Sequence, residues 1–256
     1  MSKFDNIDNG KEFDFGKTSK YYAKYRDIYP KELYKKLYEL GVGSKGQDWL
    51  DLATGTGEIP RGLYQCGANI VGVDISENQI AEAIVLAKEK GMNITYKVCP
   101  AENTGFADNS FEVITACQCF WYFDKDLIVP EIKRILRPNG LFVKVYMTWV
   151  NSDLIACKSQ ALVKRMNPDW SSGLPAEKDL TMHYFDNPIS DSFYADIPFT
   201  KETWDGRIRA CRGVLGSMTD EMLEKFTDEH HKLIAELDEE FTVRHKIYIT
   251  AYKIEK

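Results

Sequence analysis

The sequence predicts an α/β protein built on a mostly parallel sheet, and three observations support this fold class. Short apolar runs alternate with segments of helical period between residues 47 and 150. The connections between these segments are short, which is typical of right-handed βαβ units. A glycine-rich turn follows the first apolar run, where a parallel sheet usually places its ligand. We therefore expect each candidate site residue to lie at the carboxyl end of a strand.

The expected elements follow one another regularly along this stretch. The helix from Glu77 to Lys90 is the clearest, because Ser76 and Gln79 form a capping box at its start and Gly91 stands at its exit. A short helix with Pro60 in its first turn precedes it. Strands are expected over 47–54, 69–75, 93–100, 110–120 and 141–150, with a helix over 125–136 and a turn over 138–140.

The pattern is weaker outside this stretch. Tyrosine-rich residues 17–40 predict one or two helices, and residues 151–215 show irregular, aromatic-rich sequence. An amphipathic helix after Thr219 and an alternating run over 241–254 close the chain, and we expect that last strand to join the same sheet. The sequence thus predicts one domain over 1–256, divided into a helical lid (15–42), a cofactor-binding core (47–150), a substrate cap (151–215) and a closing helix and strand (219–256).

Composition excludes several classes of protein. The 33 Lys and Arg against 39 Asp and Glu give a net charge of −6 without a long basic run, which argues against nucleic-acid binding. No apolar run is long enough for a membrane span, and the polar first residues show no secretory signal. The six cysteines are scattered without zinc spacing, so we expect free thiols, no metal and a cytoplasmic location. A monomer or a homodimer is expected.

The turn after the first strand carries the first candidate site. The segment Asp51-Leu52-Ala53-Thr54-Gly55-Thr56-Gly57 allows close approach of a ligand to the backbone, although a plain tight turn would look the same. Asp74 follows at the end of the second strand, where its carboxylate can accept hydrogen bonds from a ribose diol. Pro60 stands at the third position of G-x-G-x-x-G, which disfavours a dinucleotide, and no G-K-[ST] follows, which excludes a P-loop.

Four motifs in order then resemble a known family. LDLATGTGEIPRGL, VGVDIS, CPAENTGFADNSFEVITACQCFWYF and EIKRILRPNGLFVKVYMTW are similar to the successive motifs of class I S-adenosylmethionine-dependent methyltransferases of small molecules. The four motifs most resemble those of the trans-aconitate and ubiquinone/menaquinone methyltransferases. The segment YRDIYP also resembles a segment ahead of the core in the trans-aconitate group. The resemblance implies a Rossmann-like, seven-stranded, mostly parallel sheet with an antiparallel C-terminal strand.

The resemblance also implies a set of residues that bind the cofactor. Asp74 would bind the ribose hydroxyls, Ile75 would pack on the adenine, and Gln118 would lie under the reacting methyl group. Pro100 replaces an Asp that many relatives use for adenine, so the Ala101 backbone is expected to take that part. The full expected cofactor set is Arg26, Asp51, Ala53, Thr54, Gly55, Gly57, Asp74, Ile75, Ala101, Glu102 and Gln118.

The expected acceptor site is aromatic and lacks an evident base. Trp121 stands where many relatives have His, so no catalytic residue is assigned, and His183 is the one histidine considered as a base. His230 and His231 are expected to be solvated. Two arginines on one helix face could hold an anionic acceptor, although solvated arginines would show the same spacing. The expected acceptor-binding residues are Tyr21, Tyr22, Tyr25, Trp121, Arg209 and Arg212.

These observations predict a methyltransferase that uses S-adenosylmethionine to methylate a small acidic or aromatic molecule. Methyl transfer is an in-line displacement, so the chain mainly positions the reactants. Arg26 is expected in a tyrosine-rich lid over the methionyl carboxylate or an acidic substrate, or else on an ordinary packing helix. A nicotinamide-dependent oxidoreductase and a non-catalytic protein that binds S-adenosylmethionine are the alternatives. The sequence does not identify the acceptor or the atom that is methylated.

Overall fold

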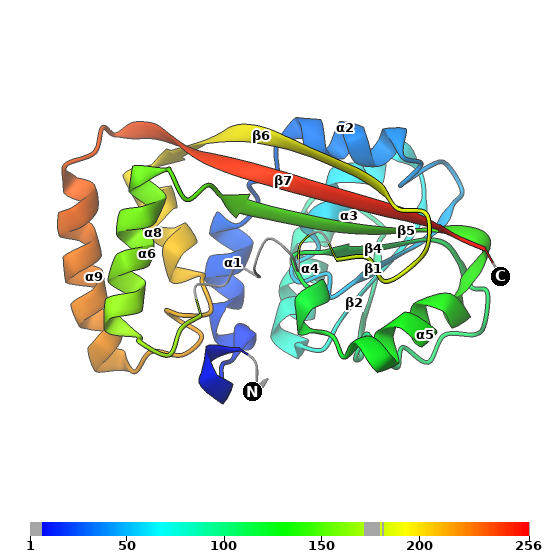
Figure 1. The fold of residues 1–256 in the computed structure, drawn as a ribbon, viewed down its shortest axis with the longest axis horizontal. Helices are drawn as coiled ribbons and strands as arrows, with labels where there is room; N and C mark the ends of the chain where they lie inside the picture. Colours follow the sequence, from blue (N-terminus) through cyan, green and yellow to red (C-terminus); the bar gives the residue numbers. More distant parts are fainter. Residues whose placement is uncertain (1–6, 172–179, 181, 256) are drawn as a thin grey trace. The chain divides into compact units, whose positions relative to one another are not determined.

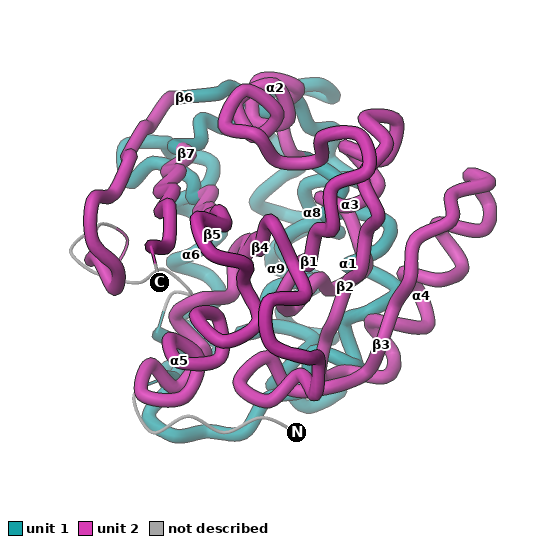
Figure 2. Tube along the Cα trace, turned by 90° about the vertical axis from the view of Figure 1, so that its right-hand side faces the viewer, with its two compact units in different colours: residues 1–28, 148–174, 194–246 teal, residues 29–147, 175–193, 247–256 magenta. Residues whose placement is uncertain are grey.

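The computed structural model describes residues 7–171, 180 and 182–255, which divide into two compact units (Figure 2). Unit 1 comprises residues 1–28, 148–174 and 194–246. Unit 2 comprises residues 29–147, 175–193 and 247–256. The expected cofactor core therefore falls almost entirely in unit 2, and the expected lid is split between the two. That the whole chain is one domain stays a prediction.

The described residues form a seven-stranded sheet in the order β3-β2-β1-β4-β5-β7-β6 (Figure 1). The strands are β1 (Asp48–Leu52), β2 (Asn69–Asp74), β3 (Thr95–Val98), β4 (Phe111–Cys117), β5 (Leu136–Trp149), β6 (Ile189–Thr200) and β7 (Glu240–Ile254). Strand β1 pairs in parallel with β2 and β4, β2 with β3, and β4 with β5. Strand β7 is antiparallel to the others, which confirms the fold class that the sequence predicts.

The register brings the carboxyl ends of the central strands to one edge. Leu52 at the end of β1 pairs with Val73 in β2 and with Ala116 in β4, and Ala116 pairs in turn with Lys144 in β5. The residues that follow these positions therefore emerge side by side. Since strand order changes direction at β1 and β4, this edge is the switch point where α/β sheets bind ligands.

Unit 2 buries one face of the sheet under helix α5 (Lys125–Ile135). Alternate strand residues such as Leu50, Leu52 and Ile114 pack there, because successive side chains point to opposite faces. The other helices of this unit are α2 (Lys31–Glu39), α3 (Glu58–Leu63) and α4 (Glu77–Glu89), with short 3-10 turns η3 (Tyr64–Cys66) and η4 (Phe120–Tyr122). Ser76 caps α4 because its hydroxyl accepts from the Gln79 amide, but the Ser76 amide donates to Asp74, so the reciprocal half of the predicted capping box is not formed.

Unit 1 is built mainly from helices. They are α1 (Ser19–Tyr25), α6 (Leu154–Met166), α8 (Lys201–Arg209) and α9 (Asp220–Ala235), preceded by 3-10 turns η1 (Asp8–Gly10) and η2 (Phe15–Thr18). Trp204 and Phe226 are fully buried in this unit. In the described part of the chain, no helix is both long and apolar enough to cross a bilayer.

Two sequence expectations are wrong. Residues 151–215, expected to be irregular, contain α6, β6 and α8. Asp153 starts α6 by accepting hydrogen bonds from the amides of Ile155 and Ala156, a cap that the aromatic content of the segment concealed. The turn expected over 138–140 lies inside β5, where Asn139 adopts φ 61° and the pairing with β4 shifts register. Turn-forming residues here make a bulge in a continuous strand.

Candidate functional site

The turn after β1 runs through left-handed backbone. Ala53, Gly55 and Gly57 have φ values of 46°, 56° and 78°. This region is easy for glycine and costly for alanine, whose Cβ approaches the following carbonyl oxygen. A strained non-glycine residue persists where the surroundings impose it, and such residues gather at functional sites. Ala53 therefore marks the start of this turn as a constrained point.

Asp51 holds the base of the turn from within the core. One carboxylate oxygen accepts a hydrogen bond from the Thr54 hydroxyl at 2.6 Å, and the other accepts from the Thr115 hydroxyl at 2.5 Å. The Thr115 oxygen in turn accepts from the Trp49 indole N–H at 2.8 Å. These contacts tie the turn to β1 and β4. Burial, together with the charge of Asp74, raises the pKa of Asp51 to about 6.

Asp74 lies at the end of β2, as predicted, and contacts the same turn. One carboxylate oxygen accepts from the Gly55 amide and the other from the Ser76 amide, both at 2.9 Å. A carboxylate offers about four lone-pair directions, so both oxygens keep acceptor capacity. Burial raises the pKa of Asp74, and the two backbone amides oppose that rise. The neighbouring Ile75 side chain is 67% exposed, an apolar surface beside an acceptor.

The role of Gly57 was not predicted from the sequence. A Cβ at this position would lie 2.2 Å from the Tyr96 hydroxyl oxygen, so the glycine makes room for that ring. Tyr96 reaches from β3 toward Arg61, whose buried guanidinium donates to the Thr56 carbonyl. Burial raises the pKa of Tyr96 to about 12 although Arg61 opposes the shift. The second glycine of the motif thus serves packing beneath the turn.

Two further predicted residues follow β3. Ala101 is buried, and Glu102 accepts a hydrogen bond from the Asp124 amide at 3.2 Å. That contact connects the segment after β3 to the start of α5. The Glu102 carboxylate therefore has a structural partner, while the backbone at Ala101 lies in the same region of unit 2 as the other strand ends.

Gln118 follows β4 and shows the same constrained backbone as Ala53. Its φ is 61°, its amide donates to the Val145 carbonyl at 2.9 Å, and its side-chain amide donates to the Met147 carbonyl. Gln118 therefore joins β4 to the end of β5. Trp121, three residues after Gln118 and within η4, stacks on Tyr146 with ring centroids 5.0 Å apart. These two rings form an aromatic surface next to Gln118.

The predicted lid residues lie in unit 1. The Arg26 guanidinium stacks over the Tyr22 ring at 4.4 Å and donates to its hydroxyl at 3.2 Å. Tyr21 and Tyr25 pack with centroids 5.6 Å apart, and the Tyr25 hydroxyl donates to Glu202 at 3.0 Å. That these residues cover the cofactor or bind the acceptor stays a prediction.

The two predicted acceptor-binding arginines have carboxylate partners inside unit 1. Arg212 makes a two-pronged contact with Asp8 at 2.5 and 2.8 Å, and both side chains are 4% exposed. Arg209 donates to Asp205 at 2.7 Å and to the Thr227 hydroxyl at 2.7 Å. Neither guanidinium is a solvated surface charge, which corrects the alternative given above. Anion binding by these two side chains stays a prediction, and each already has an intramolecular anion.

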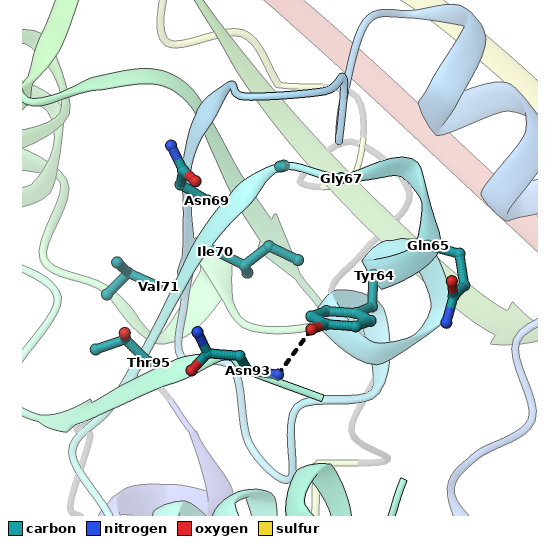
Figure 3. Close-up of a pocket in the computed structure, with 9 residues that line it drawn as sticks. Tyr64, Gln65, Gly67, Asn69, Ile70, Val71, Asn93 and Thr95 are labelled. Carbon is teal, nitrogen blue, oxygen red and sulfur yellow. Dashed lines mark hydrogen bonds between the residues drawn. The ribbon is translucent and has the colours of Figure 1, made fainter. Parts of the chain in front are cut away.

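A surface pocket of about 500 Å³ lies elsewhere in unit 2 (Figure 3). Tyr64, Asn69, Asn93 and Thr95 are among its lining residues, and the Tyr64 hydroxyl accepts from the Asn93 amide at 2.9 Å. These positions are at the starts of β2 and β3, at the opposite ends of the strands from Asp74. No predicted site residue lines this pocket.

The residues at the strand ends fit a ribosyl cofactor. The half-buried Asp74 carboxylate offers acceptors for a diol, Ile75 offers an exposed apolar face for a flat base, and the left-handed backbone at Ala53 and Gly55 carries no bulky side chain. This turn lacks the lysine with which a P-loop binds phosphate groups. The donor and acceptor set therefore agrees with the cofactor that the resemblance implies.

Comparisons with known proteins agree with this geometry. Residues 50–144 match a family model described as a methyltransferase domain. A protein of Dictyostelium discoideum named as a methyltransferase is 30% identical over 129 residues, which is 50% of this chain and 47% of that protein. The ubiquinone/menaquinone biosynthesis C-methyltransferase UbiE of Desulfotalea psychrophila is 37% identical over 98 residues, 36% of this chain and 37% of that protein. The chain thus spans about half or less of the length of these relatives.

The same fold occurs in solved structures. The YcgJ protein of a Bacillus aligns with a TM-score of 0.57 and 16% identity, over 88% of this chain and 100% of that one. The comparisons give no support for a nicotinamide-dependent oxidoreductase. The family match covers β1 to β5 and includes the glycine turn, Asp74 and Gln118. Residues 50–144 are therefore similar to a methyltransferase domain, and the chain shares its fold with that solved structure.

Proposed function

We propose that this protein transfers the methyl group of S-adenosylmethionine to a small-molecule acceptor. The observation that carries the proposal is the contact between the Asp74 carboxylate and the Gly55 amide at the switch point of the sheet. This contact supports the proposal because a carboxylate that can accept from ribose hydroxyls lies against the turn after β1, within residues 50–144. The cofactor supplies a methyl group on a positively charged sulfur, so the reaction is an in-line displacement.

The side chains around this turn then have separate parts. Asp74 accepts from the ribose hydroxyls, and Ile75 packs against the adenine. The backbone of Ala53, Thr54 and Gly55 faces the ribose and methionyl parts, while Asp51 holds that backbone in position through Thr54. Ala101 and Glu102 border the adenine edge, and Gln118 lies beneath the methyl group.

Catalysis rests on positioning because the nearby acidic groups are poor bases. Burial raises the pKa values of the Cys117 and Cys119 thiols well above their usual range, so both stay protonated at neutral pH. Asp51 is occupied by two threonine hydroxyls. An acceptor that is already ionised or unprotonated reacts without a base once it is held ~3–3.5 Å from the methyl carbon.

Further parts of the proposal concern the rest of the chain. Arg26 and the tyrosines of α1 would close over the bound cofactor, supported by the cation–π contact that orders Arg26. A cytoplasmic location agrees with the six free cysteines among the described residues. The protein would act as a monomer or a homodimer.

The test is to measure binding of S-adenosylhomocysteine by calorimetry in Asp74→Ala. We expect the Kd to rise about 10- to 100-fold, the scale for losing hydrogen bonds to a charged group. Asp108→Ala is the matched control, because Asp108 is an exposed carboxylate of the same unit, paired with Arg134 at 2.8 Å. A Kd within about twofold of the parent in Asp74→Ala would contradict the Asp74 assignment.

Turnover separates an enzyme from a protein that only binds the cofactor. The intact chain is incubated with S-adenosylmethionine and a pooled library of small acids, phenols, amines and thiols. Formation of S-adenosylhomocysteine that depends on the pool supports the methyltransferase. Tight cofactor binding with no turnover in any pool would favour the non-catalytic alternative.

A further inference from the structure

Lys144 is a buried lysine in the middle of β5. The residue is 1% exposed, and its ammonium group donates to the Met182 carbonyl at 2.8 Å. Three aromatic rings surround it, with centroids at 5.5 Å for Tyr146, 5.6 Å for Tyr184 and 6.0 Å for Phe120. No described carboxylate forms an ion pair with Lys144. Among the described residues, ring faces and one carbonyl compensate its positive charge.

A second lysine approaches the same rings. The Lys125 ammonium lies 5.0 Å from the Phe120 centroid and 5.8 Å from the Tyr184 centroid, and it donates to the Phe123 carbonyl. The two lysines repel each other, and this repulsion adds to burial in lowering the pKa of Lys144 to about 8. Burial also lowers the pKa of Lys125, and the negative charges of Glu102 and Asp124 oppose this decrease.

This arrangement is unfavourable for the chain alone. A buried cation without an anion pays a desolvation cost that cation–π contacts only partly offset. An apolar residue would fill the same space at lower cost. Two such cations beside shared rings become favourable when an anion lies between them, since each ammonium keeps donors beyond its one carbonyl. The cluster therefore has the charge and the donors of an anion site.

Its position connects the cluster to the candidate cofactor site. Lys144 pairs with Ala116 in β4, and Tyr146 lies two residues further along the same face of β5. Tyr146 carries the stacked Trp121, which follows Gln118 in the loop after β4. All these residues belong to unit 2. The cluster thus lies below an aromatic surface at the edge where the cofactor turn emerges.

We propose that Lys144 and Lys125 bind the anionic group of the methyl acceptor, and that the acceptor is a small aromatic acid whose ring packs on Trp121 and Tyr146. The acceptor's oxygen replaces the Met182 carbonyl as the partner of Lys144. This inference rests on the proposed function and names its substrate class. The proposed anion-binding residues are thus Lys144 and Lys125. Arg209 and Arg212, expected from the sequence to bind the anion, already have carboxylate partners.

The proposal predicts a proton effect as well as a binding preference. An anion next to Lys144 favours the charged amine and raises its pKa, so binding takes up protons between about pH 7 and 9. The titratable groups that face Lys144 are Lys125 and the phenols of Tyr146 and Tyr184. A role confined to packing would give no proton uptake that depends on the Lys144 side chain.

The experiment uses the intact protein saturated with S-adenosylhomocysteine, with benzoate and its neutral analogue benzamide as probes. Calorimetry in buffers of different ionisation enthalpy gives affinity and proton uptake at pH 8. We expect benzoate to bind about tenfold or more tightly than benzamide in the parent, with proton uptake. Lys144→Met should bring the two affinities within about twofold and abolish the uptake. Lys125→Met should reduce the preference.

Two controls make each outcome decisive. Lys133→Met removes another lysine beside an aromatic ring in the same unit, 5.8 Å from the Phe185 centroid, and should leave the preference intact. Methionine suits the buried Lys144 site, so that variant should melt no lower than the parent. Equal affinities for the two probes in the parent, or an unchanged preference in Lys144→Met, would overturn the inference. The proposed function would still stand if the protein bound S-adenosylhomocysteine. Failure to bind S-adenosylhomocysteine at all would overturn the proposed function.

Discussion

Unit 1 pairs several of its buried charged side chains with one another, whereas unit 2 buries charge beside strained backbone at the ends of strands. In unit 1, Asp8 meets Arg212, and Asp205 meets both Arg209 and the buried His230. Each of these carboxylates has an arginine partner in the same unit. Arg207 is an exception in this unit, because its buried guanidinium contacts the Cys211 sulfur and the Trp149 ring and forms no ion pair with a described carboxylate.

Unit 2 differs from unit 1 in three features of its sheet. Asp51 and Asp74 are near enough that the charge of Asp74 raises the pKa of Asp51, and neither carboxylate has a cationic partner in an ion pair among the described residues. Lys144 forms no ion pair with a carboxylate in the part of the chain that the structure describes. The backbone at Ala53 and Gln118 is held in the left-handed region. Buried charges without ion-pair partners and strained backbone together indicate a ligand site at this edge of the sheet, because a ligand can supply the missing partners.

The largest effect that tests this comparison is expected from Asp8→Ala in unit 1. It leaves the Arg212 guanidinium buried without its anion, which costs about 3–5 kcal/mol of unfolding free energy. The ion pair is formed at 2.5 Å, and the Arg212 charge lowers the pKa of Asp8 against its burial. Urea denaturation of variant and parent at pH 7 measures the difference.

A double variant sharpens that test. Asp8→Ala combined with Arg212→Met removes both charges, so we expect it to recover much of the stability lost in the single variant. A double variant as unstable as Asp8→Ala alone would show that the packing of these residues, and not the uncompensated charge, sets the cost. A loss below about 1 kcal/mol in the single variant would contradict the contrast between the units.

The next effect concerns Asp51 in unit 2 and depends on pH. Its folded pKa of about 6 lies above the ordinary value of 3.8, so the folded chain binds more protons between these values. Stability from this group is therefore greatest at low pH and is lost as pH rises from about 4 to 6. Asp51→Asn has no such loss. The unfolding free energy of the variant minus that of the parent should therefore rise by about 2–3 kcal/mol between pH 4 and pH 7.

Urea denaturation at several pH values, with amide exchange of β1 as a local probe, measures this difference between variant and parent. The exposed Asp108→Asn serves as the control and should show no comparable pH-dependent gain. An Asp51→Asn curve parallel to that of the parent between pH 4 and 7 would mean that the threonine hydrogen bonds offset burial fully. The comparison between the units would then lose its clearest case of unpaired buried charge.

The sequence predicted the parallel core well because its signals are local. Ser76 with Gln79, the glycine turn and Asp74 at a strand end are short-range patterns, and each is found where expected. Their order also matched a family. The comparisons confirm the fold class, and the cofactor stays part of the proposed function.

Long-range pairing could not be inferred in the same way. His230 was expected to be solvated on a charged helix, but it is fully buried, because Asp205 in α8 and Ser159 in α6 supply its partners. Helix periodicity alone does not show which face meets another element. The space that Gly57 leaves for Tyr96 likewise depends on a residue of a different strand. The segment over 151–215 was misjudged because its start depends on a single cap at Asp153.

The smallest effect concerns a group of residues in unit 1 that resembles a catalytic triad. The Asp205 carboxylate lies 2.7 Å from Nδ1 of His230, and Nε2 of His230 lies 3.1 Å from the Ser159 hydroxyl. These distances suit nucleophilic catalysis, but Ser159 and His230 have no solvent exposure. The Trp204 indole N–H also donates to the serine oxygen at 3.0 Å. Because His230 and the Trp204 indole both bond to the Ser159 oxygen, this hydroxyl serves to join helices.

Ser159→Ala should therefore cost about 1–2 kcal/mol of stability, because it leaves two buried donors or acceptors without their shared partner. Hydrolysis of p-nitrophenyl acetate should be the same in variant and parent, since no step of it passes through Ser159. The exposed Ser110→Ala gives the baseline for a serine whose hydroxyl donates to one carbonyl, that of Ala107, at the surface. An esterase activity that is lost in Ser159→Ala but kept in Ser110→Ala would show that unit 1 opens to substrates. Its paired polar groups would then mark a second functional site, and the distinction between the two units would have to be abandoned.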